Sequence, residues 1–284
     1  MTSSLRILLA VPLAAACVAI TLGLPSGCAD ESFATIEDAS SGDADASSID
    51  ATASDADAPP VKFCDGLVPA PALCADFDRG EPAEFGWSRS DIQPEGSGTF
   101  TVDTAQSKSA PASLLFRSTY QPGGGGTNWV GRDIGASNQA KITLEYDLFV
   151  EDIANAFSVW VSTLKFVEPS HEGDYVVIFS AKANGAALEE RMPPSDGGKP
   201  YNAVNALRFP IIAQWTHVAV VVDLKKTPPT VKIDLDGQPA IAERELTEGY
   251  LRGLTELDIG MPFANNVSGS VALRVDNVVL RIEP

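Results

Sequence analysis

The sequence has little positive charge and very little histidine. Its 284 residues include 20 Lys and Arg against 38 Asp and Glu, so the formal net charge is -18. This shortage of bases argues against a nucleic-acid partner, because phosphate binding needs a basic patch. With only two histidines, His171 and His217, a histidine-rich metal site and most histidine-based catalysis are not expected either.

Helical signals are also scarce. No stretch beyond the N-terminal signal combines helical periodicity with caps, and the best candidate, Ala186–Arg191, is short. The sequence instead alternates apolar and polar residues with period two, and its 23 Gly and 20 Pro interrupt the pattern often. This pattern predicts short strands joined by turns.

About twelve strands are expected in the region 62–284. Twelve strands do not fit comfortably into one flat sheet, so we expect an all-β fold of two packed antiparallel sheets, as in a sandwich or jelly roll. The expected strands are Thr99–Asp103, Ser113–Tyr120, Trp129–Ile134, Ile142–Val150, Phe157–Val167, Tyr175–Ala181, Leu207–Ile212, His217–Leu224, Thr230–Leu235, Ile241–Leu246, Glu256–Gly260 and Val271–Ile282.

Residues 1–27 have the layout of a bacterial export signal. Arg6 supplies a positive charge, and Ile7–Leu24 is almost entirely apolar. The following Ser26-Gly27-Cys28 resembles the lipobox of bacterial lipoproteins. That resemblance implies lipidation of Cys28 and, because Ala29 follows it, the outer membrane. Ordinary cleavage, with release to the periplasm or the medium, and an uncleaved membrane anchor are the alternatives.

Residues 28–61 are rich in Ala, Ser and Asp. Between 29 and 60 there are nine acidic residues and no Lys or Arg, whereas 61–284 holds 29 acidic and 19 basic residues. The like charges repel one another and few large apolar side chains are available for a core, so we expect a disordered acidic tether. Half of the excess negative charge therefore lies outside the folded domain, 62–284.

Four cysteines are present, and export favours a disulfide between the two that remain in the mature chain. Cys17 lies in the signal and Cys28 is the expected lipidation site. Cys64 and Cys74 are therefore expected to pair at the N-terminal edge of the folded domain, which leaves no catalytic thiol.

Three local signals refine the strand pattern. Asp236-Gly237 predicts a tight hairpin turn. In Val271–Ile282 the apolar alternation changes phase at Asp276-Asn277, which predicts a β-bulge. Gly123–Gly126 is not followed by the lysine of a phosphate-binding loop, and we expect it to form a flexible hairpin loop.

Several of these segments together resemble laminin-G-like and concanavalin A-like lectin/glucanase domains. The resemblance rests on Trp215–Asp223, the Asp236-Gly237 turn, the closing Val275–Leu280, and the opening Leu73–Asp78 with Trp87. It covers about residues 62–284 and implies a jelly-roll β-sandwich. It implies no single activity, because this fold carries lectins, glycosidases, lyases and adhesion modules.

Candidate catalytic carboxylates lie on one expected strand. A glycosidase needs two carboxylates about 5–10 Å apart across the sugar bond. Glu145, Asp147 and Glu151 share one strand face and superficially resemble the catalytic strand of laminarinase-like glucanases, although the last glutamate lies six positions after the first. A solvated strand face explains the same pattern without catalysis. His171 and His217 match no lyase pattern and are expected to be structural or exposed.

Sugar binding needs exposed aromatic faces that stack on sugar rings. The candidates on or near loops are Trp87, Tyr120, Trp129, Tyr201 and Tyr250. Tyr120 and Trp129 flank the glycine run and are expected at one rim of the domain. A tryptophan of a sandwich can equally belong to the core.

The resemblance also implies one structural calcium ion. In related sugar-binding sandwiches, an aspartate in the closing Val-Asp-Asn-Val strand helps to hold calcium. Here that residue is Asp276, with Asp76 or Asp78 of the first strand and backbone carbonyls completing the site. The alternative is that Asp276 and Asn277 satisfy backbone groups at the bulge.

Taken together, these features predict an exported surface lipoprotein whose β-sandwich binds an extracellular glycan or cell-envelope component without catalysis. The lipid anchor would supply the contact with the membrane. A carbohydrate-active enzyme, either a glycoside hydrolase or a polysaccharide lyase, is the first alternative. A structural or protein-adhesion module of the cell envelope is the second.

Overall fold

A computed structural model of the chain describes most of the region expected to fold. It covers residues 62–94, 97–135, 139–153, 158–167, 173–183, 185–192, 201–247 and 249–284. The predictions for the export signal, for Cys28 and for the acidic tether lie outside these residues, as does His171. Within them, no helix has both the length and the apolar character needed to cross a membrane.

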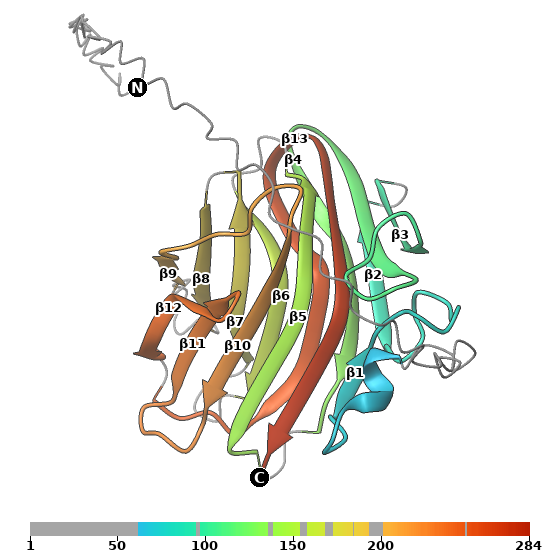
Figure 1. The fold of residues 1–284 in the computed structure, drawn as a ribbon. Helices are drawn as coiled ribbons and strands as arrows, with labels where there is room; N and C mark the ends of the chain where they lie inside the picture. Colours follow the sequence, from blue (N-terminus) through green and yellow to red (C-terminus); the bar gives the residue numbers. More distant parts are fainter. Residues whose placement is uncertain are drawn as a thin grey trace, which may run out of the picture. The chain divides into compact units, whose positions relative to one another are not determined.

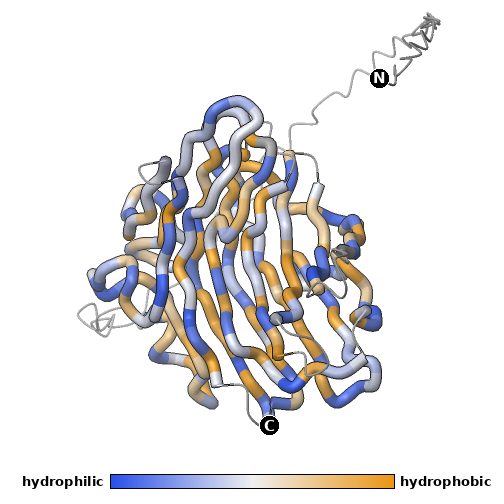
Figure 2. Tube along the Cα trace, turned by 180° about the vertical axis from the view of Figure 1, so that it is seen from behind, coloured by the Kyte–Doolittle hydropathy of each residue, from blue (hydrophilic) through white to orange (hydrophobic). Residues whose placement is uncertain are grey.

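Nearly all regular structure in these residues is β, with one short 3₁₀ helix, η1 (Phe63–Gly66). The period-two alternation explains this: along β10, Val218, Val220 and Val222 are buried and the residues between them are partly exposed. Figure 2 shows hydrophobic and hydrophilic segments alternating along neighbouring strands. The strands are β1 (Leu73–Ala75), β2 (Arg89–Gln93), β3 (Gly98–Asp103), β4 (Ser113–Asp133), β5 (Lys141–Asp152), β6 (Ser158–Val167), β7 (Asp174–Lys182), β8 (Gly185–Arg191), β9 (Tyr201–Asn205), β10 (Trp215–Asp223), β11 (Thr230–Leu235), β12 (Gln238–Glu245) and β13 (Leu254–Glu283).

The strands form two layers with antiparallel pairing throughout. In layer A the strand order is β12-β11-β10-β5 and then the C-terminal half of β13. On its other side, this half of β13 pairs with β1 and with the first part of β4, which in turn pairs with β3. In layer B the strand order is β9-β8-β7-β6 and then the N-terminal half of β13. On its other side, this half of β13 pairs with the last part of β4, which in turn pairs with β2. Apolar side chains of both layers share one core, across which the hydroxyls of Tyr146 and Ser162 hydrogen-bond at 3.1 Å. The predicted all-β jelly-roll sandwich is confirmed.

Two long strands join the layers. β4 and β13 pair from Glu256 opposite Asp133 to Val275 opposite Leu114. Figure 1 shows them turning over together at the top of the molecule. The prediction that Gly123–Gly126 forms a hairpin loop between two strands was wrong, because these glycines lie inside β4 where the pair bends.

Three local predictions are confirmed. Asp236 and Gly237 form the turn between β11 and β12, with φ angles of 51° and 70°. The register between β13 and β5 shifts after Asp276, as expected for a bulge. Cys64 and Cys74 form a disulfide.

Ala186–Arg191, the best helical candidate in the sequence, lies in a strand instead. It belongs to β8, where Ala186 and Leu188 point into the core, whereas Ala187 and Glu189 alternate with them. The short alternating pattern fits a strand, and the segment is too short for helical periodicity to show.

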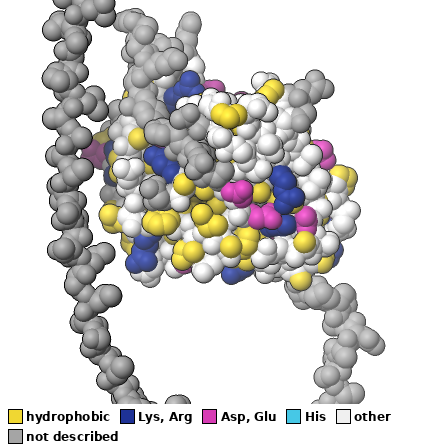
Figure 3. Space-filling view, turned by 90° about the horizontal axis from the view of Figure 1, so that it is seen from above, with side chains coloured by type: hydrophobic (Ala, Val, Ile, Leu, Met, Phe, Trp, Pro, Cys, Tyr) yellow, Lys and Arg dark blue, Asp and Glu magenta, His cyan; other side chains and the backbone are white. Residues whose placement is uncertain are grey.

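Leu207–Ile212 was predicted to be a strand, but it is a connection between the layers. β9 ends at Asn205, and the Leu207 N–H donates to the Ala240 carbonyl where the chain crosses from layer B toward layer A. Leu207 is 81% exposed, and three further apolar side chains of this segment are exposed. After this segment, β10 starts at the upper end of the molecule in Figure 1. Figure 3 shows that end, where hydrophobic side chains lie among charged ones.

Gly126→Ala is expected to destabilise the fold. A Cβ at Gly126 would lie 1.9 Å from the Gln93 carbonyl oxygen, so β2 would have to move away from β4. We expect the free energy of unfolding to fall by about 1–3 kcal/mol. Gly135→Ala is the matched control, because a Cβ there meets nothing within 4 Å. Chemical denaturation checks the prediction, and equal midpoints for the two variants would contradict it.

Candidate functional site

The outer face of layer B combines aromatic and charged side chains. These side chains alternate along their strands with residues of the core, so they point away from it. We call this set the layer B face. Its members are Arg89 of β2, Trp129 of β4, Ser158, Trp160, Thr163 and Lys165 of β6, Ser180 of β7, Glu189 and Arg191 of β8, and Glu256, Asp258 and Phe263 of β13.

Trp160 is the centre of an aromatic group on this face. Its ring centroid lies 4.9 Å from that of Phe263, and the two planes are inclined at 49°. The Arg191 guanidinium lies 5.9 Å from the Trp160 ring centroid, within the range of a cation–π contact. Phe263 is 38% exposed and Trp160 is partly exposed. The group therefore offers solvent a fixed aromatic surface with a cation at its border.

Glu189 fixes the orientation of Trp160. Its Oε2 accepts the indole Nε1–H at 2.9 Å, and its Oε1 accepts hydrogen bonds from the hydroxyls of Ser180 at 2.6 Å and Ser158 at 3.1 Å. Glu189 is only 2% exposed. All three of these donors are neutral, so among the described residues hydrogen bonds hold this buried carboxyl group.

A second group on the same face is held by ion pairs. Arg89 donates to Glu256 at 2.8 Å and to Asp258 at 3.1 Å, and Lys165 donates to Glu256 at 2.5 Å. The Arg89 guanidinium also lies 5.4 Å from the Trp129 ring centroid. The arrangement places Trp129 beside a rigid charged network on the face that carries Trp160.

The two acids of this network have opposite pKa shifts. Burial raises the pKa of Asp258, against the opposing effect of Lys165 and of the hydrogen bond from Thr163. Burial also acts on Glu256, but hydrogen bonds and charge from Lys165 and Arg89 outweigh it, so the pKa of Glu256 is lowered. Glu256 is therefore the firmly ionised partner of the two cations.

A glycine makes the approach of Trp129 to this network possible. A Cβ at Gly131 would lie 2.5 Å from Asp258 Oδ1 and 2.7 Å from Trp129 Cζ3. Any side chain at this position would force the indole away from the acid, so the contact depends on Gly131.

The aromatic residues predicted from sequence fall in different places. Trp87 and Tyr120 are 8% and 5% exposed and belong to the core, so their predicted stacking on a sugar is corrected. Trp129 lies on the layer B face, whereas Tyr250 is 62% exposed in the segment before β13. The register pairs Tyr201 with Arg191, and the Tyr201 side chain lies outside the described part of the structure.

Sequence reasoning missed Trp160. It lies on the expected strand Phe157–Val167, between Val159 and Val161 of the core. That alternation was a usable signal, because it places Trp160 on the face away from the core. Its partners Phe263 and Glu189 come from β13 and β8, and no local pattern predicts that they meet it.

The outer face of layer A carries the three carboxylates proposed for catalysis. Glu145, Asp147 and Glu151 point outward from β5, as their shared parity predicts. Each already has a partner. Arg281 binds Glu145 at 2.5 Å and Arg117 binds Glu151 at 3.2 Å. To act as an acid–base pair on a sugar bond, these carboxylates would first have to break their ion pairs with the arginines.

Asp147 is held by two neighbouring strands. His217 of β10 lies 3.2 Å from its Oδ1, and Asn277 of β13 donates to its Oδ2 at 2.9 Å. The hydrogen bond to Asp147 raises the pKa of His217 above its usual value, although burial opposes the shift. His217 thus links β10 to β5, in agreement with the structural role expected for it.

The aspartates proposed for calcium do come close together. Asp276 is fully buried, and the Ser109 hydroxyl lies 3.4 Å from it and 3.3 Å from Asp78. Asp276 Oδ2 accepts the backbone N–H groups of Lys108 and Ser109 at 2.8 and 2.9 Å. Asp76 accepts the N–H of Cys64 at 3.0 Å.

These bonds occupy oxygens that a cation would need. Asp78 accepts the Ala112 N–H, and Asp276 Oδ1 accepts that of Asn277. Over the described residues, no group of three or more His, Cys, Asp or Glu side chains is arranged to hold a metal ion. The present geometry therefore fits backbone anchoring better than coordination, and calcium at Asp276 stays a prediction.

Comparison with known proteins bears on the fold. Neither protein-family models nor curated proteins match this chain. Among solved structures, an endo-β-1,4-glucuronan lyase from the fungus Trichoderma reesei matches with 16% identity and a TM-score of 0.56, over 75% of this chain and 96% of the lyase. A cellulose-induced protein matches at 12% identity and TM-score 0.49, over 73% and 96%. A family 7 alginate lyase matches at 9% identity and TM-score 0.45, over 70% and 86%. At these identities the likeness shows the jelly-roll fold alone.

The pH dependence of stability is expected to report on Asp276. Burial, with a smaller contribution from nearby Asp78, raises the pKa of Asp276 to about 7 from an ordinary value of 3.8. Between these two pKa values, the Asp276 carboxyl group therefore keeps its proton in the folded chain and loses it in the unfolded chain. Stability from this group is present at low pH and is lost as pH rises from about 4 through about 7.

Asp276→Asn removes this titration and supplies the comparison. We expect the difference in free energy of unfolding, variant minus wild type, to increase from pH 4 to pH 8, whatever its value at pH 4. Urea denaturation of both proteins at matched pH values measures it. A difference that stays constant with pH would contradict the assignment.

Proposed function

We propose that the layer B face binds a glycan without catalysis. The observation that carries the proposal is Trp160, partly exposed, packed against Phe263 and fixed in orientation by Glu189. Sugar rings present C–H faces that pack on aromatic rings, and hydroxyls that bond to carboxylates and guanidinium groups. The face supplies both kinds of group.

The face is broad enough to contact more than one sugar unit. Trp160 lies on β6, β6 pairs with β13, and β13 pairs with β4, which carries Trp129. Two strand spacings separate β6 from β4, roughly 10 Å. An extended glycan chain is therefore favoured over a single sugar.

The acidic groups of this face favour binding over hydrolysis. Glu189 accepts hydrogen bonds from three donors. Glu256 and Asp258 form ion pairs with Arg89 and Lys165. A general acid or base must exchange a proton with the substrate, which these bonds oppose. Among the described residues, the layer B face has no histidine.

A polysaccharide lyase is the second candidate. It is favoured by the fold shared with the glucuronan lyase, and by the cations on the layer B face. Arg191 is the cation best suited to meet a uronate carboxylate, since its described contact is with an aromatic ring rather than an acid. A lyase would leave an unsaturated uronate product, whose ultraviolet absorbance distinguishes it from simple binding.

A protein-adhesion role is the third candidate, and it is favoured by a different surface. Leu207, Phe209, Ile211 and Ile212 are all about half exposed or more, between β9 and β10. Contiguous exposed apolar side chains mark protein contacts in many domains. This surface does not depend on Trp160.

Trp160→Ala is expected to weaken glycan binding about tenfold, because an aromatic stacking face is worth about 1.5 kcal/mol at most beyond its buried area. A glycan array on the full chain identifies the ligand, and calorimetry then compares the variants, with the absorbance assay run on uronate polymers in parallel.

Trp215→Ala is the matched control. Trp215 also packs on a phenylalanine, Phe149, with ring centroids 5.4 Å apart, but it lies on the outer face of layer A. Its loss should leave affinity unchanged. Equal losses in both variants, or no bound glycan at all, would count against the layer B face.

For localisation, we propose that the chain is exported and held at the outer membrane by lipid on Cys28. The signal-like residues 1–27, the lipobox-like Ser26-Gly27-Cys28 and the acidic segment after it support this proposal. Cys28→Ala should abolish labelling with radioactive palmitate and move the chain from the membrane fraction to the soluble one. A wild-type chain that takes up no label would exclude the anchor.

A further inference from the structure

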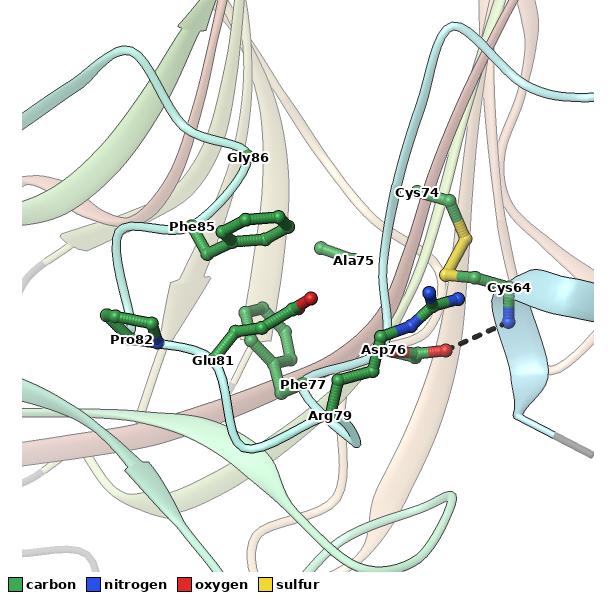
Figure 4. A pocket seen from close by; sticks show the side chains of 10 residues that line it. All are labelled: Cys64, Cys74, Ala75, Asp76, Phe77, Arg79, Glu81, Pro82, Phe85 and Gly86. Atoms are coloured by element: carbon green, nitrogen blue, oxygen red, sulfur yellow. Dashed lines mark hydrogen bonds between the residues drawn. A yellow bond between two sulfur atoms is a disulfide. The ribbon is translucent and has the colours of Figure 1, made fainter. Parts of the chain in front are cut away.

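A cavity of about 250 Å³ lies beside the disulfide, far in sequence from Trp160 and sharing no residue with the layer B face. Figure 4 shows its wall. The apolar part is formed by the Cys64–Cys74 disulfide, two phenyl rings and a proline, and the polar part by three charged side chains. The lining includes Asp76, Phe77, Arg79, Glu81, Pro82 and Phe85.

The two phenyl rings differ in exposure. Phe77 is 6% exposed and adopts a φ of 57°, a left-handed conformation that a bulky residue rarely takes. Phe85 is 60% exposed, although it lines the cavity. Because Phe85 is exposed while it lines the cavity, a group from solvent can reach this part of the wall.

The charged side chains of the cavity are not equally engaged. Arg79 is bonded to Asp65, and Asp76 accepts the N–H groups of Cys64 and Asp78. Glu81, by contrast, has no hydrogen bond or ion pair with any residue in the described part of the chain. In Figure 4 its carboxylate points into the space between the Phe85 ring and the disulfide. The acceptor without a described partner in this cavity is therefore the Glu81 carboxylate, beside the Phe85 ring.

We propose that this cavity binds a primary ammonium group, as carried by a lysine side chain or an amino sugar. Glu81 accepts the ammonium hydrogens and the Phe85 ring covers the attached carbon chain. The surrounding charge agrees, because residues 62–86 contain five acidic and two basic side chains. The volume also agrees, because it is below that of sites for drug-sized ligands and suits one side chain or one sugar ring.

This inference is independent of glycan binding at the layer B face. Loss of Trp160 should not affect it, and failure of the ammonium probes would leave the glycan proposal intact. The two sources of the ammonium group are separated by the choice of probe.

The test uses the full chain and backbone amide shifts measured by NMR. The probes are Nα-acetyl-lysine amide and glucosamine, each beside a neutral counterpart, Nα-acetyl-norleucine amide and glucose. The ammonium probes are expected to shift amides in Cys74–Gly86, and the neutral ones are not. The probe with the larger saturable shift identifies the source of the ammonium group.

Glu81→Gln keeps the side-chain size and removes the charge, so we expect affinity for the ammonium probe to fall tenfold or more, as is typical for loss of a charged hydrogen-bond acceptor. Glu84→Gln is the matched control, since Glu84 is exposed on the same segment outside the cavity lining. Equal affinity for neutral and ammonium probes, equal losses in the two variants, or no saturable shift with either ammonium probe would overturn the proposal.

Discussion

β4 and β13 hydrogen-bond to each other across both layers of the sandwich, and each layer takes its central strands from these two segments. For a pair of strands to turn over together, the backbones must approach closely at the bend. A Cβ at Gly125 would lie 2.2 Å from the Ala264 carbonyl oxygen, so glycine is required there. Because Trp129 and Phe263 lie on these strands next to the bend, the same close packing positions the aromatic side chains of the layer B face.

The two outer faces of the sandwich handle charge in different ways. On layer A, Glu145, Asp147 and Glu151 of β5 each meet a basic or amide group of another strand, so this face carries local pairs. On layer B, Arg89 and Lys165 form ion pairs, but the buried Glu189 accepts hydrogen bonds from neutral donors and the Arg191 guanidinium lies over a ring. Layer B thus holds its polar groups in a fixed geometry beside the exposed aromatic rings.

Much of the fold could be predicted from sequence because its signals are local. Alternation placed most strands, Asp236-Gly237 placed a turn, and the phase change at Asp276-Asn277 placed the bulge. The glycine run misled for a physical reason: glycine marks both loops and close strand packing, and only the partner strand β13 decides between them. Leu207–Ile212 misled because a run of apolar residues is the same signal whether a segment is buried or exposed.

The candidate site was much less predictable than the fold. Aromatic residues were sought on loops, whereas Trp160 lies in the middle of a strand. What distinguishes it is its contact with Glu189 and Phe263, which are 29 and 103 residues away in sequence. Trp87 and Tyr120 have the same chemistry but face the core. Single-residue type and local spacing cannot separate these cases, because the difference arises from strand pairing over long distances.

The position of β13 in the chain has a consequence for how the protein is made. β13 occupies residues 254–283 and pairs with β1, β4, β5 and β6. Neither layer can acquire its central strand until almost the whole of this sequence has left the ribosome, and the contacts then formed are distant in sequence and slow to close. Both layers can therefore be completed only after β13 has been made, so the closing of the sandwich is a late step in folding.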